Sequence, residues 1–173
     1  MDLQTFLQGL AYIFPAYVSN ATPVVVSKML KKLHPIDGGH VFFDGRRIFG
    51  DGKTVEGFVS GTAVGFVAGF LISYFIPWLL SVSEAFLLAV GALLGDIAGA
   101  FIKRRAGLRT GSPAPLLDQL GFLAAALALV HFTVGLPGWL DALTVMALLA
   151  LTFFMHMATN AAAYFLRLKD RWY

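Results

Sequence analysis

Acidic and basic side chains suited to phosphate chemistry gather in one short segment of this 173-residue sequence. Asp96 is followed by a basic run that begins at Lys103, and Asp118 lies beyond it. Because residues seven apart share a helix face, we expect Asp96 and Lys103 on one face of a helix. Carboxylates beside basic residues suit Mg²⁺, which takes one or two carboxylates plus substrate phosphates. A purely structural network of salt bridges is the alternative.

A glycine-rich segment carries a second signal for phosphate. It reads Gly50-Asp51-Gly52-Lys53-Thr54 and directly precedes an apolar run. Backbone amides at a helix N-terminus, together with a lysine, favour a bound anion. The segment is not a P-loop, because Arg47 stands where that motif requires glycine. A flexible linker is the alternative. Upstream, the dipeptide Asp44-Gly45 predicts a small hairpin.

The apolar runs predict an all-α integral membrane protein. Hydrophobic residues make up 58% of the chain and charged residues 13%, with a mean hydropathy of +0.75. Soluble proteins have about 25% charged residues. A helix needs about 20 apolar residues to cross a bilayer. We predict a single transmembrane domain over residues 1–173, with two functional cytoplasmic loops at 31–54 and 103–115. Its five transmembrane helices are expected at about 3–30, 55–80, 84–102, 116–136 and 140–168.

The positions of the basic residues predict the orientation of the five helices. All 13 Lys and Arg residues lie near the two loops or after the last apolar run. Under the positive-inside rule these segments are cytoplasmic, so the chain is expected to be N-out and C-in in the cell membrane. Most acidic residues lie on the same side, although acids contribute little to orientation, which favours chemistry at the inner face. The basic net charge therefore reflects topology, and we expect no nucleic acid partner.

Small and polar residues inside the apolar runs suggest how the helices pack. Glycines recur every fourth residue, a spacing that lets two helix backbones approach closely. We favour packing within the bundle, which would hold Asp96 rigidly, although the same stripes could serve a homodimer. Asn160 is expected to form interhelical hydrogen bonds, with a place in the pocket wall as the alternative. The stripes are Gly57, Gly61, Gly65 and Gly69, followed by Gly91, Gly95 and Gly99.

Taken together, these segments resemble the CDP-archaeol synthases, the archaeal lipid cytidylyltransferases related to bacterial phosphatidate cytidylyltransferases. The matching stretches are Phe43–Thr54, Gly95-Asp96, Lys103-Arg104-Arg105, Gly107, Gly111, Pro115 and Asp118-Gln119. The resemblance implies an enzyme of membrane phospholipid biosynthesis, surrounded by membrane lipids. It would transfer CMP from CTP to an isoprenoid ether-lipid phosphate, 2,3-di-O-geranylgeranylglyceryl phosphate, and release CDP-archaeol and pyrophosphate.

The resemblance also implies roles for individual residues. Asp96 and Asp118 would bind Mg²⁺ and act in catalysis with Lys103. The expected substrate-binding residues are Gly50, Asp51, Gly52, Lys53, Thr54, Arg104 and Arg105, to which the pocket-wall alternative adds Asn160 from its position alone. The bacterial relatives carry a further acid where this chain has Gly121, which puts a second metal ion in doubt.

Two other functions remain open from the residues alone. A five-span glycerol-phosphate acyltransferase would act at the same membrane face without CTP. A small transporter would be expected to carry ionisable residues deep in its spans.

Overall fold

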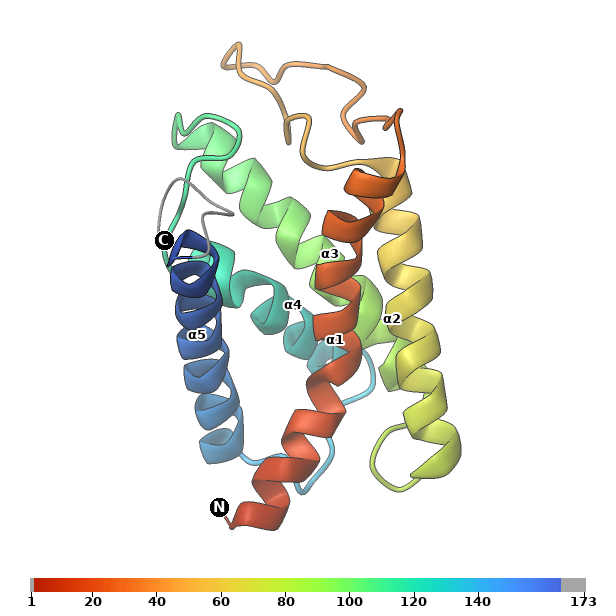
Figure 1. Cartoon of the computed structure of the whole chain (residues 1–173). Helices are drawn as coiled ribbons and strands as arrows, with labels where there is room; N and C mark the ends of the chain where they lie inside the picture. Colours follow the sequence, from red (N-terminus) through yellow and green to blue (C-terminus); the bar gives the residue numbers. More distant parts are fainter. Residues whose placement is uncertain (1, 166–173) are drawn as a thin grey trace.

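The computed structural model describes residues 2–165, with the backbone alone for Asn160 and residues 162–164. The described part is a bundle of five helices without a β-strand (Figure 1). Four of these helices are long and apolar enough to cross a membrane, in agreement with an integral membrane protein. The helices are α1 (Leu3–Met29), α2 (Val55–Phe75), α3 (Val82–Arg105), α4 (Leu117–Thr133) and α5 (Ala142–Phe165).

The helices differ by two to five residues from the second and third spans expected. Helix α2 ends at Phe75 rather than near residue 80, because Pro77 cannot continue a helix. Helix α3 begins at Val82 rather than 84 and continues to Arg105. Its start is set by a capping box, in which Ser81 accepts from the Glu84 amide and the Glu84 carboxylate accepts from the Ser81 amide.

The fourth helix is shorter than predicted. It has 17 residues, Leu117–Thr133, where a span over 116–136 was expected. At a rise of 1.5 Å per residue this is about 25 Å, compared with about 30 Å for the hydrocarbon core. Leu116 and Gly135 both have positive φ, 66° and 82°, and so interrupt helical geometry at the two ends. The end predicted for the fifth span, near residue 168, lies outside the described residues.

The glycine stripes are contact surfaces inside the bundle, as we favoured. Helix α1 packs chiefly against α2, and α3 against α4. A Cβ atom placed on Gly65 of α2 would lie 2.8 Å from the carbonyl oxygen of Pro15 in α1. A Cβ atom on Gly95 of α3 would lie 2.6 Å from the carbonyl oxygen of Gly121 in α4. The two helix pairs therefore touch backbone to backbone at these glycines.

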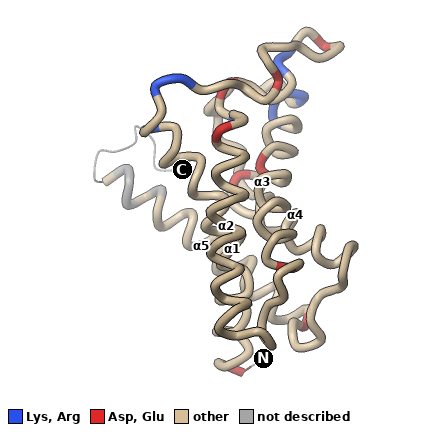
Figure 2. The backbone as a smooth tube through the Cα atoms, turned by 90° about the vertical axis from the view of Figure 1, so that its right-hand side faces the viewer, with Lys and Arg blue, Asp and Glu red and all other residues tan. Residues whose placement is uncertain are grey.

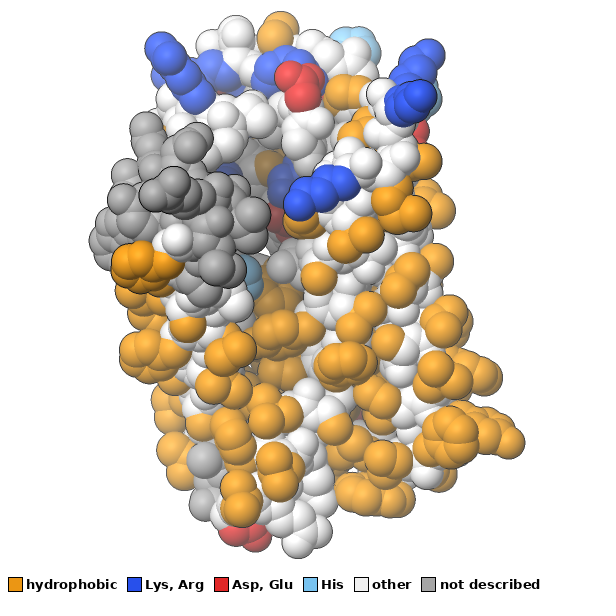
Figure 3. All heavy atoms as spheres, in the orientation of Figure 1, with side chains coloured by type: hydrophobic (Ala, Val, Ile, Leu, Met, Phe, Trp, Pro, Cys, Tyr) orange, Lys and Arg blue, Asp and Glu red, His pale blue; other side chains and the backbone are white. Residues whose placement is uncertain are grey.

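The described basic residues gather at one end of the bundle, opposite the N-terminus (Figure 2). This end contains the loop between α1 and α2 and the loop between α3 and α4 (Figure 1). Below it, hydrophobic side chains cover the visible face of the bundle (Figure 3). The fold thus brings the two sequence segments with phosphate chemistry to a common end.

The close contact at Gly65 predicts a stability difference between two glycine substitutions. Gly65→Ala should destabilise the protein by about 1–3 kcal/mol, because the new Cβ would overlap Ser19 and Pro15. Gly121→Ala is the matched control, since its Cβ would meet only a side-chain carbon of Leu117 at 3.7 Å. That change should be neutral or stabilise the helix by up to about 1 kcal/mol. Unfolding in detergent measures both, and equal shifts would contradict the packing account.

Candidate functional site

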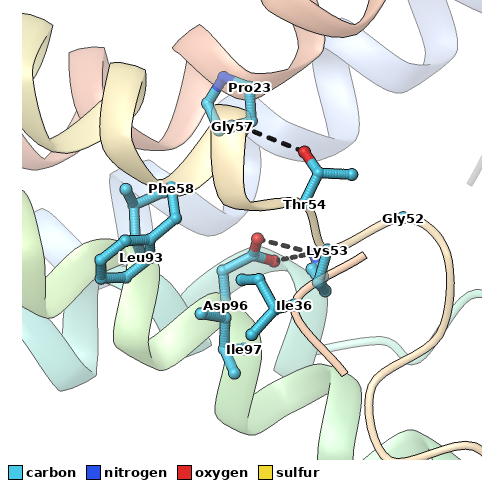
Figure 4. Close-up of a pocket in the computed structure, with 10 residues that line it drawn as sticks. All are labelled: Pro23, Ile36, Gly52, Lys53, Thr54, Gly57, Phe58, Leu93, Asp96 and Ile97. Atoms are coloured by element: carbon cyan, nitrogen blue, oxygen red, sulfur yellow. Dashed lines mark hydrogen bonds and ion pairs between the residues drawn. The ribbon is translucent and has the colours of Figure 1, made fainter. Parts of the chain in front are cut away.

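Lys53 and Asp96 form an ion pair in a pocket at the basic end (Figure 4). Lys53 directly precedes α2, whose first turn is capped by Thr54, a side chain that accepts from the Gly57 amide at 3.2 Å. The Lys53 ammonium donates to both carboxylate oxygens of Asp96, each at 2.6 Å. The pocket holds little more than a water molecule, and apolar side chains such as Phe58 and Leu93 form its inner wall. The ion pair thus joins the first loop to α3.

A second ion pair joins α3 to the start of α4. The Lys103 ammonium donates to one carboxylate oxygen of Asp118 at 2.7 Å. The other oxygen of Asp118 accepts from the amide of Ala114 at 2.8 Å. Both carboxylates remain partly exposed, with 36% of the Asp96 side chain and 39% of the Asp118 side chain accessible.

The two predicted carboxylates therefore have different lysine partners. The seven-residue step from Asp96 to Lys103 is about 10 Å along the helix axis. Sharing a helix face therefore does not bring these two side chains into contact. Helices α3 and α4 touch at Gly95 and Gly99, which holds Asp96 and Asp118 on neighbouring turns of two packed helices.

Arg104 lies buried between the two loops. Its guanidinium donates to the hydroxyl of Thr110 at 2.7 Å and to the carbonyl oxygen of Arg109 at 3.0 Å. Both acceptors are neutral, and the described residues place no carboxylate within 4 Å of this charge. Gly50 lies directly beside it, because a Cβ there would be 2.7 Å from the Thr110 hydroxyl. A buried cation with neutral partners suits an anionic ligand.

Arg105 instead holds the first loop against the end of α3. Its guanidinium pairs with Asp44 at 2.8 Å and stacks over the rings of Phe42 and Phe101. In return, Arg46 donates to the carbonyl oxygen of Arg105 at 2.7 Å. Arg105 thus has a carboxylate partner and holds the loop in place, and its expected contact with substrate stays a prediction.

The hairpin predicted at Asp44-Gly45 is present as a tight turn. The Phe42 amide donates to the Arg46 carbonyl at 2.7 Å, and Val41 and Arg47 form a single antiparallel bridge. This turn presents Asp44 and Arg46 to the end of α3.

Asp37 is the centre of the first loop, and sequence reasoning gave it no role. Its carboxylate is fully buried and accepts from Arg47 at 2.6 Å and from the amides of Phe49, Gly50 and Gly39. Burial opposes ionisation, but the hydrogen bonds from Arg47 and the amides outweigh it and hold the pKa of Asp37 well below its usual value. The sequence Asp37-Gly38-Gly39 was the only signal, because it marks a turn.

The other expected binding residues are placed as follows. The amide of Gly50 donates to Asp37 at 2.9 Å and is therefore already engaged. Asp51 is 73% exposed and pairs with Arg47 at 2.7 Å, while Gly52 lines the pocket beside Lys53. The side chain of Asn160 lies outside the described residues.

The acidic residues present limit the kind of metal site that the chain can build. The described residues contain no group of three or more His, Cys, Asp or Glu side chains that could enclose an ion. Partly exposed carboxylates such as those of Asp96 and Asp118 are the ligand type of an ion that takes its remaining ligands from water and substrate phosphates, as Mg²⁺ does.

The Asp37 cluster predicts that one substitution opens the first loop and another does not. Asp37→Asn should make trypsin cut at Arg46 and Arg47 at least about ten times faster, because a buried charge pair is broken. Asp51→Asn removes the exposed partner of Arg47 and should change the rate little. The lowered pKa of Asp37 adds stability that is present above its ordinary value of 3.8 and is lost as the pH falls below it. Equal cleavage of both variants at neutral pH would refute this role.

Known proteins match this chain over nearly its whole length. Residues 2–173 match the family model described as CarS-like, CDP-archaeol synthase. The CDP-archaeol synthase of Thermofilum pendens is 48% identical over 166 residues, covering 94% of this chain and 79% of that protein. The CDP-archaeol synthase of Aeropyrum pernix is 42% identical, covering 96% and 92%.

A solved structure agrees with the sequence comparisons. It is described as "Structural insight into an intramembrane enzyme for archaeal membrane lipids biosynthesis" and is 40% identical to this chain. Its TM-score is 0.79, with 90% of this chain and 94% of that chain covered. The five-helix architecture, the two loops and these matches lead to one conclusion: the chain belongs to the CDP-archaeol synthase family.

Proposed function

We propose that this protein transfers CMP from CTP to an unsaturated archaeal ether-lipid phosphate, 2,3-di-O-geranylgeranylglyceryl phosphate, and releases pyrophosphate. The observation that carries the proposal is the pair of carboxylate–lysine contacts beside the buried Arg104, at the basic end of a membrane protein of this family. Membership of this family favours CMP transfer over the acyltransferase and transporter functions that the residues alone left open.

The reaction needs positioning and charge neutralisation more than a strong base. An oxygen of the lipid phosphate is already a nucleophile and attacks the α-phosphorus of CTP. A new O–P bond forms while the bond to the β-phosphate oxygen breaks, and pyrophosphate leaves in line with the attack. Cationic side chains stabilise the charge that gathers on the phosphate oxygens. Lys53, Lys103 and Arg104 would supply these charges.

We further propose Mg²⁺ as the ion, held by Asp96 and Asp118. When bound, the ion would neutralise phosphate charge and polarise the reacting phosphoryl group. The support is the chemistry of two hard oxygen ligands, without a third side chain that would favour a closed zinc-type site. The roles of Gly52 and Thr54 toward CTP belong to the same proposal, since both flank Lys53 at its ion pair with Asp96.

The site is proposed to face the cytoplasm in a single transmembrane domain. The support is the gathering of the described Lys and Arg residues at one end, which the positive-inside rule assigns to the cytoplasm. The N-terminus would then lie outside. At the basic end, Figure 3 shows a hollow with acidic and basic side chains inside it, above the hydrophobic surface of the bundle. A lipid phosphate at the level of the inner headgroups could reach such a site sideways from the bilayer.

The reaction predicts pyrophosphate release that depends on CTP, lipid phosphate and a divalent ion together. Purified protein in detergent would be given each of the four nucleoside triphosphates in turn. Asp96→Asn and Asp118→Asn should each reduce release by at least about 100-fold, as expected when charge stabilisation at the reacting phosphate is lost.

Asp141→Asn is the control for these variants, because that carboxylate caps the start of α5 through the Thr144 amide, next to the short loop that follows α4. The control should keep near-normal turnover. Release with every nucleotide alike, or near-normal release by both site variants, would contradict the proposal.

The proposed orientation predicts which introduced cysteines react in intact cells. The chain contains no cysteine, so a single introduced thiol can be followed without background. Ser83 and Ala106 are exposed at opposite ends of α3. An impermeant maleimide should label Ser83→Cys in intact cells, while Ala106→Cys should react only after the membrane is opened. The reverse pattern would place the site outside.

A further inference from the structure

The two carboxylates proposed as metal ligands are both held by lysine ammonium groups. The Lys53 ammonium donates to both oxygens of Asp96 at 2.6 Å, and the Lys103 ammonium donates to one oxygen of Asp118 at 2.7 Å. The lysine side chains are less exposed than the carboxylates, with 24% and 15% accessible. These ammonium groups therefore compete with a metal ion for three of the four carboxylate oxygens.

We propose that Lys53 and Lys103 act as exchangeable counter-ions, so that the site takes the divalent ion and CTP together rather than the ion first. This inference rests on the proposed function. A divalent ion bound to the carboxylates must displace the ammonium groups, because like charges repel at contact distance. On its own the ion would leave both lysines partly buried without an acidic partner, since the remaining contact of Lys103 is the neutral carbonyl oxygen of Ser112 at 3.4 Å, and this arrangement disfavours binding.

The triphosphate removes this penalty. Its anionic oxygens can accept the displaced lysines, and they also supply ligands to the ion. Arg104 already lies nearby with neutral partners only, so it needs no rearrangement of ion pairs to meet a phosphate. Ion and nucleotide each bind better when the other is present, and thermodynamic linkage makes the gain equal in both directions.

The exchange predicts that removing either lysine has opposite effects on two affinities, that for the ion and that for CTP. Without nucleotide, each lysine competes with the ion, so its removal should tighten ion binding. With nucleotide, each lysine binds phosphate, so its removal should weaken CTP binding. A lysine that only stabilised the fold, or only bound CTP, would not tighten ion binding when removed.

The test measures Mn²⁺ binding without nucleotide, by electron paramagnetic resonance of the free ion, in full-length protein in detergent. Lys53→Gln and Lys103→Gln should each bind Mn²⁺ about tenfold tighter than the parent protein, within the usual range of coupling. Lys53→Arg keeps the charge and should not show this gain. Arg109→Gln removes an exposed charge from the second loop and should have little effect, because salt screens exposed charges.

The second measurement is CTP affinity with saturating metal and with chelator, in the absence of lipid acceptor. The metal should tighten CTP binding at least about tenfold in the parent protein and clearly less in Lys53→Gln. Unchanged or weaker Mn²⁺ binding by both glutamine variants, in protein with parental unfolding behaviour, would overturn the inference.

Pyrophosphate release by the parent protein separates the two possible failures. If CTP is turned over but the variants gain no affinity for the ion, the counter-ion exchange alone is wrong. If CTP gives no turnover with lipid phosphate and metal, the proposed function is wrong.

Discussion

Contact between helix backbones at glycine is the constraint on which the site depends. Helix α3 approaches α4 so closely at Gly91 and Gly95 that a Cβ there would lie within 3 Å of backbone atoms. The same holds for α2 against α1 at Gly61 and Gly65. In a bilayer, where lipid is as apolar as the side chains, such close packing is a main source of helix association. It fixes Asp96 relative to Asp118 without any polar contact between them.

The charged end of the bundle is organised in two layers of contacts. In the outer layer, the buried carboxylate of Asp37 binds groups of the first loop, and Arg105 connects that loop to α3. In the inner layer, two lysines bridge loop and helices through Asp96 and Asp118. The outer contacts pair each carboxylate with an arginine of the protein, which suits a scaffold. The inner contacts are ion pairs that are partly exposed to solvent. In the proposed exchange, the lysines bind phosphate and the carboxylates bind the metal ion.

The helices could be predicted because apolar length and charge placement are local properties of the sequence. Hydropathy alone did not give their ends, because Leu116 and Gly135 leave helical geometry with positive φ. The end of α2 was readable from Pro77, a residue that cannot continue a helix. The glycine spacing predicted close packing correctly, because residues four apart share a face in any helix. Spacing alone could not reveal that Asp96 pairs with Lys53, 43 positions away, or that Asp37 collects the amides of its own loop. Both depend on the path of a loop rich in glycines with positive φ.

Anomalous diffraction from crystals grown with CTP and Mn²⁺ would test the central claim most directly. The account predicts a manganese peak bonded to the carboxylates of Asp96 and Asp118 and to phosphate oxygens, with the ammonium groups of Lys53 and Lys103 moved onto the triphosphate. A peak held by other residues, or CTP bound while both lysines still pair with the carboxylates, would contradict it.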